Sequence, residues 1–208
     1  MLNIAVLVSG GGTNLQALLD AEKAGALSGG KIVRVISSSP DAYALERARM
    51  HGVATAVVRR KDYADLDAFD DALLTALAEC RPDLIVLAGF MTIFGARVVE
   101  MYRNRIINVH PALIPSFCGK SFYGLHVHRA VLESGVKLTG ATVHLVNEIC
   151  DGGPIISQKA VEVLPGDTPE VLQQRVMKQA EQKLLPQAVA LFCAGKIKVE
   201  GNLAKVID

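Results

Sequence analysis

A polar pair stands at the end of an apolar segment, in the run Asn108-Val109-His110-Pro111. Side chains alternate along a strand, so Asn108 and His110 should point to the same side. An amide and an imidazole placed side by side can donate hydrogen bonds to one carbonyl oxygen, and histidine can move a proton near neutral pH. The pair therefore predicts chemistry at a carbonyl group. A strand-end histidine bonded to the backbone is the structural alternative.

A carboxylate follows further along the chain, in the run DGGP at residues 151–154. An aspartate before two glycines commonly forms a turn. A carboxylate beside an imidazole also raises the pKa of the imidazole and fixes its orientation. Asp151 is therefore a candidate partner of His110, provided that the fold brings the two residues together.

A third polar run, SGGGTN at residues 9–14, lies between an expected strand and an expected helix. Glycines let backbone N–H groups approach an anion, and the N-terminus of a helix carries partial positive charge. The run is a candidate phosphate site, with a tight turn that binds nothing as the alternative. It matches neither G-x-x-x-x-G-K-[ST] nor a complete G-x-G-x-x-G, because Leu15 takes the sixth position counted from Gly10.

The remaining histidines and cysteines are weaker candidates. No pair of histidines has the spacing of a known metal motif and no C-x-x-C pair occurs, so we expect no metal. No obvious base stands beside a cysteine, so we interpret the thiols as structural. The residues concerned are His51, His126, His128, His144, Cys118 and Cys150.

The composition limits the class of protein. The chain has 208 residues, of which 50% are hydrophobic and 21% charged, and its formal net charge is +1. These values are typical of one globular domain with a core of its own. A nearly neutral chain has no bulk attraction for nucleic acid or anionic membranes. No apolar run approaches the roughly 18 residues of a membrane span, and the start lacks a basic segment, so we expect a cytoplasmic protein.

Short apolar runs alternate with helical patterns, and this rhythm predicts an α/β fold. We expect a Rossmann-like, mostly parallel twisted sheet with helices on both faces. The expected strands are 3–8, 32–37, 53–58, 84–88, 105–109, 139–146 and 155–163, and the expected helices are 14–26, 41–51, 63–80, 126–134 and 168–193. Pro186 predicts a kink or a break in the last helix. Residues 111–125, rich in proline and glycine, predict a long loop.

Five motifs in order resemble the glycinamide ribonucleotide branch of the formyltransferase superfamily. They are SGGGTNL at 9–15, LAGFM at 87–91, NVHPALIP at 108–115, GATVH at 140–144 and DGGP at 151–154. The resemblance extends over about residues 2–195. It implies one formyltransferase domain over residues 1–208, with a phosphate-binding half (1–105) and a catalytic, folate-binding half (106–208).

The resemblance also implies a reaction. The co-substrate 10-formyltetrahydrofolate would donate its formyl group to the amine of glycinamide ribonucleotide, in purine biosynthesis and without a metal. Asn108 and protonated His110 would stabilise the oxyanion, while Asp151 would orient His110 and assist proton transfer. The acceptor would contact Gly11, Gly12, Thr13, Asn14 and Glu181. The folate would contact Met91, Thr92, Ile93, Phe94, Asn108, Val146, Asn147, Glu148, Ile149 and Cys150.

Some features depart from the usual pattern of that family. Thr92 and Leu66 stand where arginines that contact folate are common, and residues 117–124 replace a shorter turn. The last helix is one residue longer near 176–181, which affects the assignment of Glu181. None of these departures involves Asn108, His110 or Asp151.

Alternative functions from other classes remain open. A formyltetrahydrofolate hydrolase usually carries an N-terminal regulatory domain, and a methionyl-tRNA formyltransferase carries a basic C-terminal domain; we expect neither here. A non-catalytic nucleotide-binding module would keep the glycine loop without needing Asn108, His110 and Asp151. The expected partners are two small molecules, without nucleic acid or membrane, and the expected state is a monomer or a homodimer.

Overall fold

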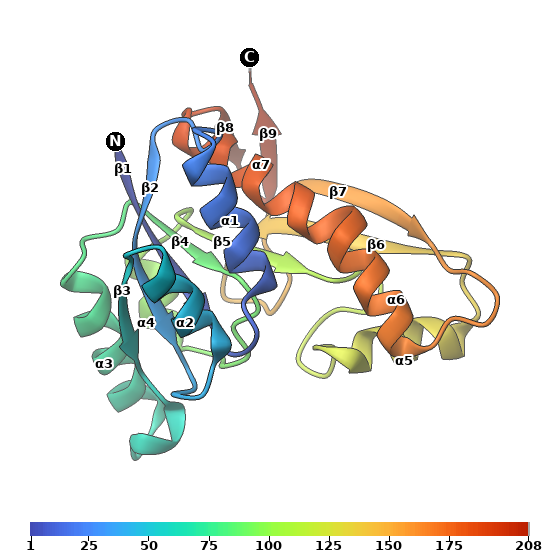
Figure 1. Cartoon of the computed structure of the whole chain (residues 1–208), viewed down its shortest axis with the longest axis horizontal. Coiled ribbons are helices and arrows are strands. Elements are labelled where there is room, and N and C mark those ends of the chain that lie inside the picture. The colour runs from blue at the N-terminus through green and yellow to red at the C-terminus, as the bar shows by residue number, and fades with distance from the viewer. Residues whose placement is uncertain (208) are drawn as a thin grey trace.

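The computed structural model describes residues 1–207, which form a seven-stranded sheet with helices on both faces and a small separate hairpin (Figure 1). The strand order is β3-β2-β1-β4-β5-β6-β7. The first five strands in this order run parallel, whereas β6 and β7 are each antiparallel to the strand before them. The predicted α/β class with a mostly parallel sheet is confirmed.

The strands are β1 (Leu2–Val8), β2 (Gly30–Ser37), β3 (Ala54–Val57), β4 (Leu84–Leu87), β5 (Ile106–His110), β6 (Leu138–Leu145), β7 (Ile155–Glu162), β8 (Ile197–Glu200) and β9 (Leu203–Val206). The α-helices are α1 (Thr13–Lys23), α2 (Tyr43–Met50), α3 (Leu66–Ala78), α4 (Ala96–Met101), α5 (Leu125–Ser134), α6 (Pro169–Val176) and α7 (Gln182–Cys193). A 3-10 turn, η1, spans Arg60–Asp62, and a π turn, η2, spans Met177–Glu181.

Alternate residues of the central strands fill two cores. In β1, Ile4 and Val6 belong to the core that α1, α2, α6 and α7 cover. Ala5 and Leu7 belong to the core on the other face, which α3 and α4 cover. Because both faces of these strands are buried, their sequences are continuous apolar runs rather than alternating ones.

The sheet reverses its direction of winding between β1 and β4. The chain leaves β1 for β2 and β3 on one side and returns to β4 on the other. The loops after β1 and β4 therefore separate at the carboxyl edge, where open α/β sheets bind ligands. A hydrogen bond of 2.8 Å from the Met91 N–H to Ser9 Oγ ties these two loops together.

The last long helical segment contains the π turn. A π turn accommodates about one extra residue per turn, which explains the extra residue noted near 176–181. Gln173, Met177 and Glu181 consequently face the same cavity at intervals of four residues. Of the kink or break predicted at Pro186, the break is wrong, because α7 continues through this residue, and the kink stays a prediction. Buried Leu185 and Val189, on either side of the proline, pack in the core and offset the lost backbone hydrogen bond.

The sequence analysis missed three short elements, α4, β8 and β9. The hairpin had a recognisable signal, since Gly201-Asn202 forms a two-residue turn between alternating apolar residues. The helix predicted over 63–80 begins only at Leu66. Its N-terminus is set by Asp65, whose carboxylate accepts a hydrogen bond of 2.8 Å from the Ala68 N–H.

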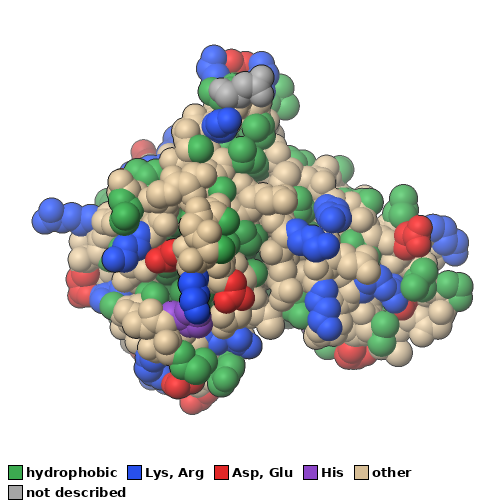
Figure 2. All heavy atoms as spheres, turned by 45° about the horizontal axis from the view of Figure 1, so that its top comes forward, with side chains coloured by type: hydrophobic (Ala, Val, Ile, Leu, Met, Phe, Trp, Pro, Cys, Tyr) green, Lys and Arg blue, Asp and Glu red, His purple; other side chains and the backbone are tan. Residues whose placement is uncertain are grey.

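The surface and the helices agree with the composition. Basic and acidic side chains are interspersed over the face that Figure 2 shows, as the net charge of +1 suggests. Within residues 1–207, every helix is too short or too polar to cross a membrane.

Candidate functional site

The carboxyl end of β5 brings the predicted trio together. Asn108 and His110 lie on β5, and Asp151 lies in the turn that joins β6 to β7. His110 Nδ1 is 3.5 Å from Asp151 Oδ2, and Asn108 Nδ2 is 3.5 Å from Asp151 Oδ1. The structure therefore brings together the three polar residues of two separate motifs, and their catalytic role stays a prediction.

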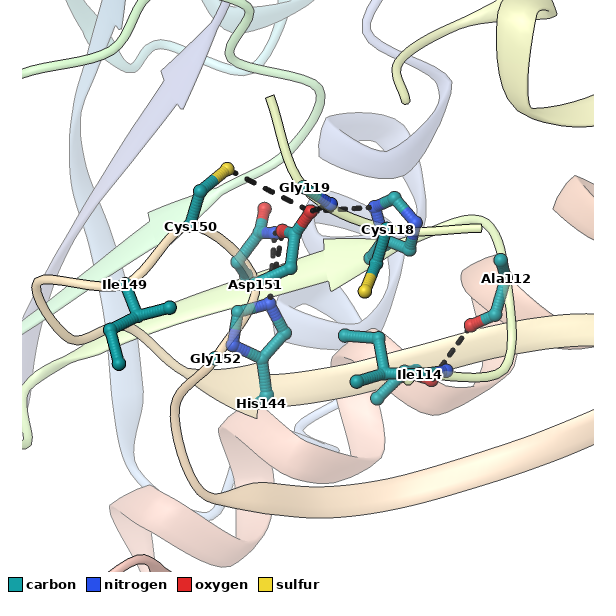
Figure 3. A network of polar contacts seen from close by, with 12 residues as sticks. Ala112, Ile114, Cys118, Gly119, His144, Ile149, Cys150, Asp151 and Gly152 are labelled. Atoms are coloured by element: carbon teal, nitrogen blue, oxygen red, sulfur yellow. Dashed lines mark hydrogen bonds and ion pairs between the residues drawn. The ribbon is translucent and has the colours of Figure 1, made fainter. Parts of the chain in front are cut away.

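The backbone around Asp151 shows why its motif contains two glycines. Asp151 has a φ of 55°, in the left-handed region that non-glycine residues seldom adopt. A Cβ on Gly153 would lie 1.9 Å from the Leu145 carbonyl oxygen, so only glycine fits there. The N–H of Gly119, from the loop before α5, donates to Asp151 Oδ2 at 2.9 Å. Asp151 is thus held at the centre of a polar network (Figure 3).

His144 belongs to this network, which the sequence analysis did not expect. It pairs with Asn108 across β5 and β6. His144 Nδ1 lies 2.9 Å from the Leu145 carbonyl and donates to it. His144 Nε2 lies 3.1 Å from Asn108 Nδ2 and 3.6 Å from Asp151 Oδ1. The signal in the sequence was a single histidine in an otherwise apolar strand. In the structure, this histidine fixes the orientation of the Asn108 amide.

Burial and nearby charges determine the protonation of His110 and Asp151. Burial lowers the pKa of His110, against the raising effects of Asp151 and of the Phe117 carbonyl, which lies 2.8 Å from His110 Nε2. The imidazole is therefore neutral at pH 7, with its proton on Nε2. Burial alone would raise the pKa of Asp151, but His144, His110 and the Gly119 N–H together lower it, so the carboxylate is ionised.

Two cavities meet at the trio. The first, of about 550 Å³, extends from the trio to the N-terminus of α1 and to the π turn. The second, of about 290 Å³, is bounded largely by apolar side chains, including Leu87, Phe94 and Val146. The residues that line both cavities are Phe90, Thr92, Ile93, Asn108, Lys120, Cys150 and Asp151.

The residues predicted for the acceptor are only partly in the first cavity. Thr13, Asn14 and Glu181 line it, whereas Gly11 and Gly12 line neither cavity. Gly12 instead has a packing role, since its φ is 73° and a Cβ would lie 2.6 Å from Ala44 Cβ on α2. Helix α1 has no side-chain cap and no acidic residue in its first turn. Its terminal N–H groups can therefore bind an anion.

A buried polar pair lies at the wall of this cavity. Asn14 Nδ2 donates to Glu181 Oε2 at 2.7 Å, which connects α1 to the π turn. Burial raises the pKa of Glu181, and the bond from Asn14 opposes this effect only in part. Asn14 Oδ1 is buried without a hydrogen-bond partner, so a ligand that donates a hydrogen bond would satisfy it.

The residues predicted for the folate, except Met91, line the second cavity. Met91 lines the first cavity instead. Members of the set that line the second are Thr92, Ile93, Phe94, Asn108, Val146, Asn147, Glu148, Ile149 and Cys150. Burial and Asp151 raise the pKa of the Cys118 and Cys150 thiols, which remain protonated and poorly nucleophilic. Residues 1–207 contain no cluster of three or more His, Cys, Asp or Glu side chains suited to a metal ion.

His128 on α5 is fully buried, and neither ring nitrogen has a hydrogen-bond partner. Burial, with a smaller effect of His110, lowers its pKa to about 4. In the unfolded chain, His128 binds a proton at its ordinary pKa of about 6.5. The free energy of unfolding should therefore rise by up to about 3 kcal/mol as the pH increases from 4 to 6.5. His128→Leu should reduce this rise in urea unfolding, whereas exposed His126→Leu should not. An unchanged pH dependence in His128→Leu would contradict the buried neutral ring.

Comparisons with known proteins identify the family. The formyl transferase family model matches residues 2–189. The phosphoribosylglycinamide formyltransferase of Escherichia coli (strain K12) is 39% identical over 203 residues, which cover 98% of this chain and 92% of that protein. Glycinamide ribonucleotide transformylase 1 from Symbiobacterium toebii superposes with a TM-score of 0.93 at 43% identity, covering 100% of this chain and 95% of that one.

A more distant structure bears on the hydrolase alternative. A formyltetrahydrofolate deformylase from Pseudomonas syringae superposes with a TM-score of 0.88, but it is only 25% identical and this chain covers 66% of it. The Escherichia coli and Symbiobacterium toebii proteins are more similar to this chain, at 39% and 43% identity. The chain is therefore a member of the formyl transferase family, within its phosphoribosylglycinamide formyltransferase branch.

Proposed function

We propose that the protein transfers the formyl group of 10-formyltetrahydrofolate to the amine of glycinamide ribonucleotide, a step of purine biosynthesis. The observation that carries the proposal is the position of Asn108 and Asp151 in the wall shared by two cavities. A formyl group that moves from a ligand in one cavity to a ligand in the other must pass the residues that both cavities share. His110, which lines the first cavity, completes the reacting surface.

Each cavity suits one substrate. The first offers the N-terminus of α1, the Asn14 amide and the Glu181 carboxyl group, which suit a phosphorylated ribose with hydroxyl and amine groups. The second offers an apolar enclosure with a few polar groups, which suits the bicyclic ring of a folate. In this assignment residues 1–105 contribute the phosphate site, and residues 106–208 contribute the trio and much of the folate site.

The arrangement of the trio supports the following course of the reaction. The neutral amine attacks the formyl carbon, a C–N bond forms, and the carbonyl electron pair moves to oxygen. The Asn108 amide and the His110 Nε2–H, which donates to Phe117 in the structure, stabilise this oxyanion. The bond to the folate nitrogen then breaks, and a water held by Asp151 carries the proton from the incoming amine to the leaving nitrogen.

Binding of the acceptor favours the charged form of His110. The ring is neutral in the structure because burial lowers its pKa. A phosphate dianion in the same cavity attracts a positive charge and raises this pKa. The imidazolium, paired with Asp151, is then a stronger hydrogen-bond donor to the oxyanion than the neutral ring.

A steady-state assay distinguishes the proposal from its alternatives. We expect tetrahydrofolate to accumulate only when 10-formyltetrahydrofolate and glycinamide ribonucleotide are both present. Tetrahydrofolate formed at the same rate without the acceptor would identify a hydrolase instead. Binding of both ligands without turnover would identify a non-catalytic module.

A further inference from the structure

We propose that Lys120 binds the glutamyl carboxylates of the formyl donor at the mouth of the second cavity. The inference rests on the proposed function and assigns a residue for donor specificity. A folate consists of a bicyclic ring, an aromatic aminobenzoyl ring and a glutamyl tail with at least two carboxylates. A site for the whole molecule therefore needs a cation beyond its apolar enclosure.

Among residues 1–207, no lysine or arginine other than Lys120 lines the first or the second cavity. It lines both cavities and forms no ion pair within 4.0 Å in residues 1–207. The nearby acidic residue Glu148 is already paired with Arg103. Lys120 is thus the available partner for a carboxylate at this opening.

The charge of Lys120 reaches the second cavity. Burial and Asp151 raise the pKa of the Cys150 thiol, and the positive charge of Lys120 opposes this rise. Lys120 and Cys150 both line this cavity, so a carboxylate bound there lies within reach of the ammonium group.

Apolar side chains surround the same opening. Ile93 and Ile149 line the second cavity, yet they are 58% and 68% exposed. Met91, which lines the adjoining first cavity, is 50% exposed. A single exposed hydrophobic residue is ordinary, whereas several around one opening mark a binding surface. This surface suits the aminobenzoyl ring, which connects the buried bicyclic ring to the charged tail.

The loop anchors the backbone of Lys120 but leaves its side chain exposed. The preceding Gly119 donates to Asp151 at 2.9 Å, and the Phe122 N–H donates to the Gly119 carbonyl at 2.9 Å. Phe117 and Phe122 pack edge to face, with ring centroids 6.3 Å apart. The loop therefore places an exposed lysine beside the donor cavity, where the neighbouring Thr92 supplies no charge.

Donors with and without glutamate test the assignment. Lys120→Met should raise the KM for 10-formyltetrahydrofolate roughly 3- to 10-fold and leave kcat unchanged, because an exposed charged hydrogen bond contributes a modest affinity. The KM for the methylamide of 10-formyltetrahydropteroate, which has neither glutamate nor a free carboxylate, should not change. Lys120→Arg should retain affinity, and added salt should reduce the difference between variant and wild type. Lys159→Met, an exposed lysine on β7 outside both cavities, is the matched control.

Three results would overturn the assignment. They are an equal KM change for both donors, no change for either, or a change confined to the KM of the acceptor. Calorimetric Kd values for 5-formyltetrahydrofolate and for the methylamide of 5-formyltetrahydropteroate give the same comparison without turnover. Wild-type protein that fails to transfer the formyl group would contradict the proposed function, whereas normal wild-type transfer with an unaffected Lys120→Met variant would contradict only this inference.

Discussion

His110→Ala is expected to lower kcat by about 10³-fold or more, while phosphate-containing ligands still bind. The imidazole is the group in the trio that can both donate to the oxyanion and accept a proton, and alanine does neither. The ring is buried, but the acceptor site at α1 and Glu181 does not depend on it. Initial rates and the Kd of glycinamide ribonucleotide measure the two effects separately.

The control for this variant is His126→Ala. His126 lies on α5, is exposed and lines neither cavity, so its loss should leave kcat unchanged. Parallel loss of turnover, ligand affinity and thermal stability in His110→Ala would mean that His110 supports the fold rather than the reaction. Turnover within about tenfold of wild type would remove His110 from the mechanism.

Asp151→Asn is expected to lower kcat by about 10²- to 10⁴-fold with little change in either KM. The carboxylate faces His110 Nδ1 at 3.5 Å and raises the pKa of that ring. An asparagine removes the charge, so the pKa of His110 should fall further below its ordinary value and the imidazolium should become harder to form. NMR titration of the His110 ring, with and without the acceptor, measures this shift.

The direction of the pKa shift of His110 distinguishes the loss of the Asp151 charge from a change in the geometry of the site. The acceptor should raise the pKa of His110 in both proteins, and Asp151→Asn should have the lower value under each condition. An unchanged or higher pKa in Asp151→Asn would show that Asp151 does not stabilise the charged ring. Asp71→Asn, whose carboxylate pairs with Arg97 on the surface of α3 and lines neither cavity, is the matched control.

The fold class and the trio were predictable because their signals are local or regular. Continuous apolar runs such as residues 3–8 occur in strands buried on both faces, and the structure places β1 at the centre of the sheet. The alternation that aligned Asn108 with His110 is a property of any strand. Nothing in the spacing shows that β6 returns antiparallel to β5, and this pairing is what places Asp151 and His144 beside them.

The parts that were missed depend on tertiary contacts. The ligand contacts expected of the glycine loop stay a prediction, but the close approach of α2, which requires a glycine at position 12, was not expected. Pro186 predicted a break that core packing prevents. The position of Lys120 depends on a Gly119–Asp151 hydrogen bond between residues 32 apart. The local sequence does not predict such contacts, because each residue could contact many others that are distant in the sequence.

The fate of the formyl carbon tests the central claim most directly. A single turnover with 10-[¹³C]formyltetrahydrofolate and glycinamide ribonucleotide can be followed by ¹³C NMR, with His110→Ala as the inactive reference. The two-cavity account predicts that the label appears on the amine nitrogen of the acceptor, without labelled formate. Label released as formate, at a rate that does not depend on the acceptor, would contradict direct transfer of the formyl group from the folate to the acceptor.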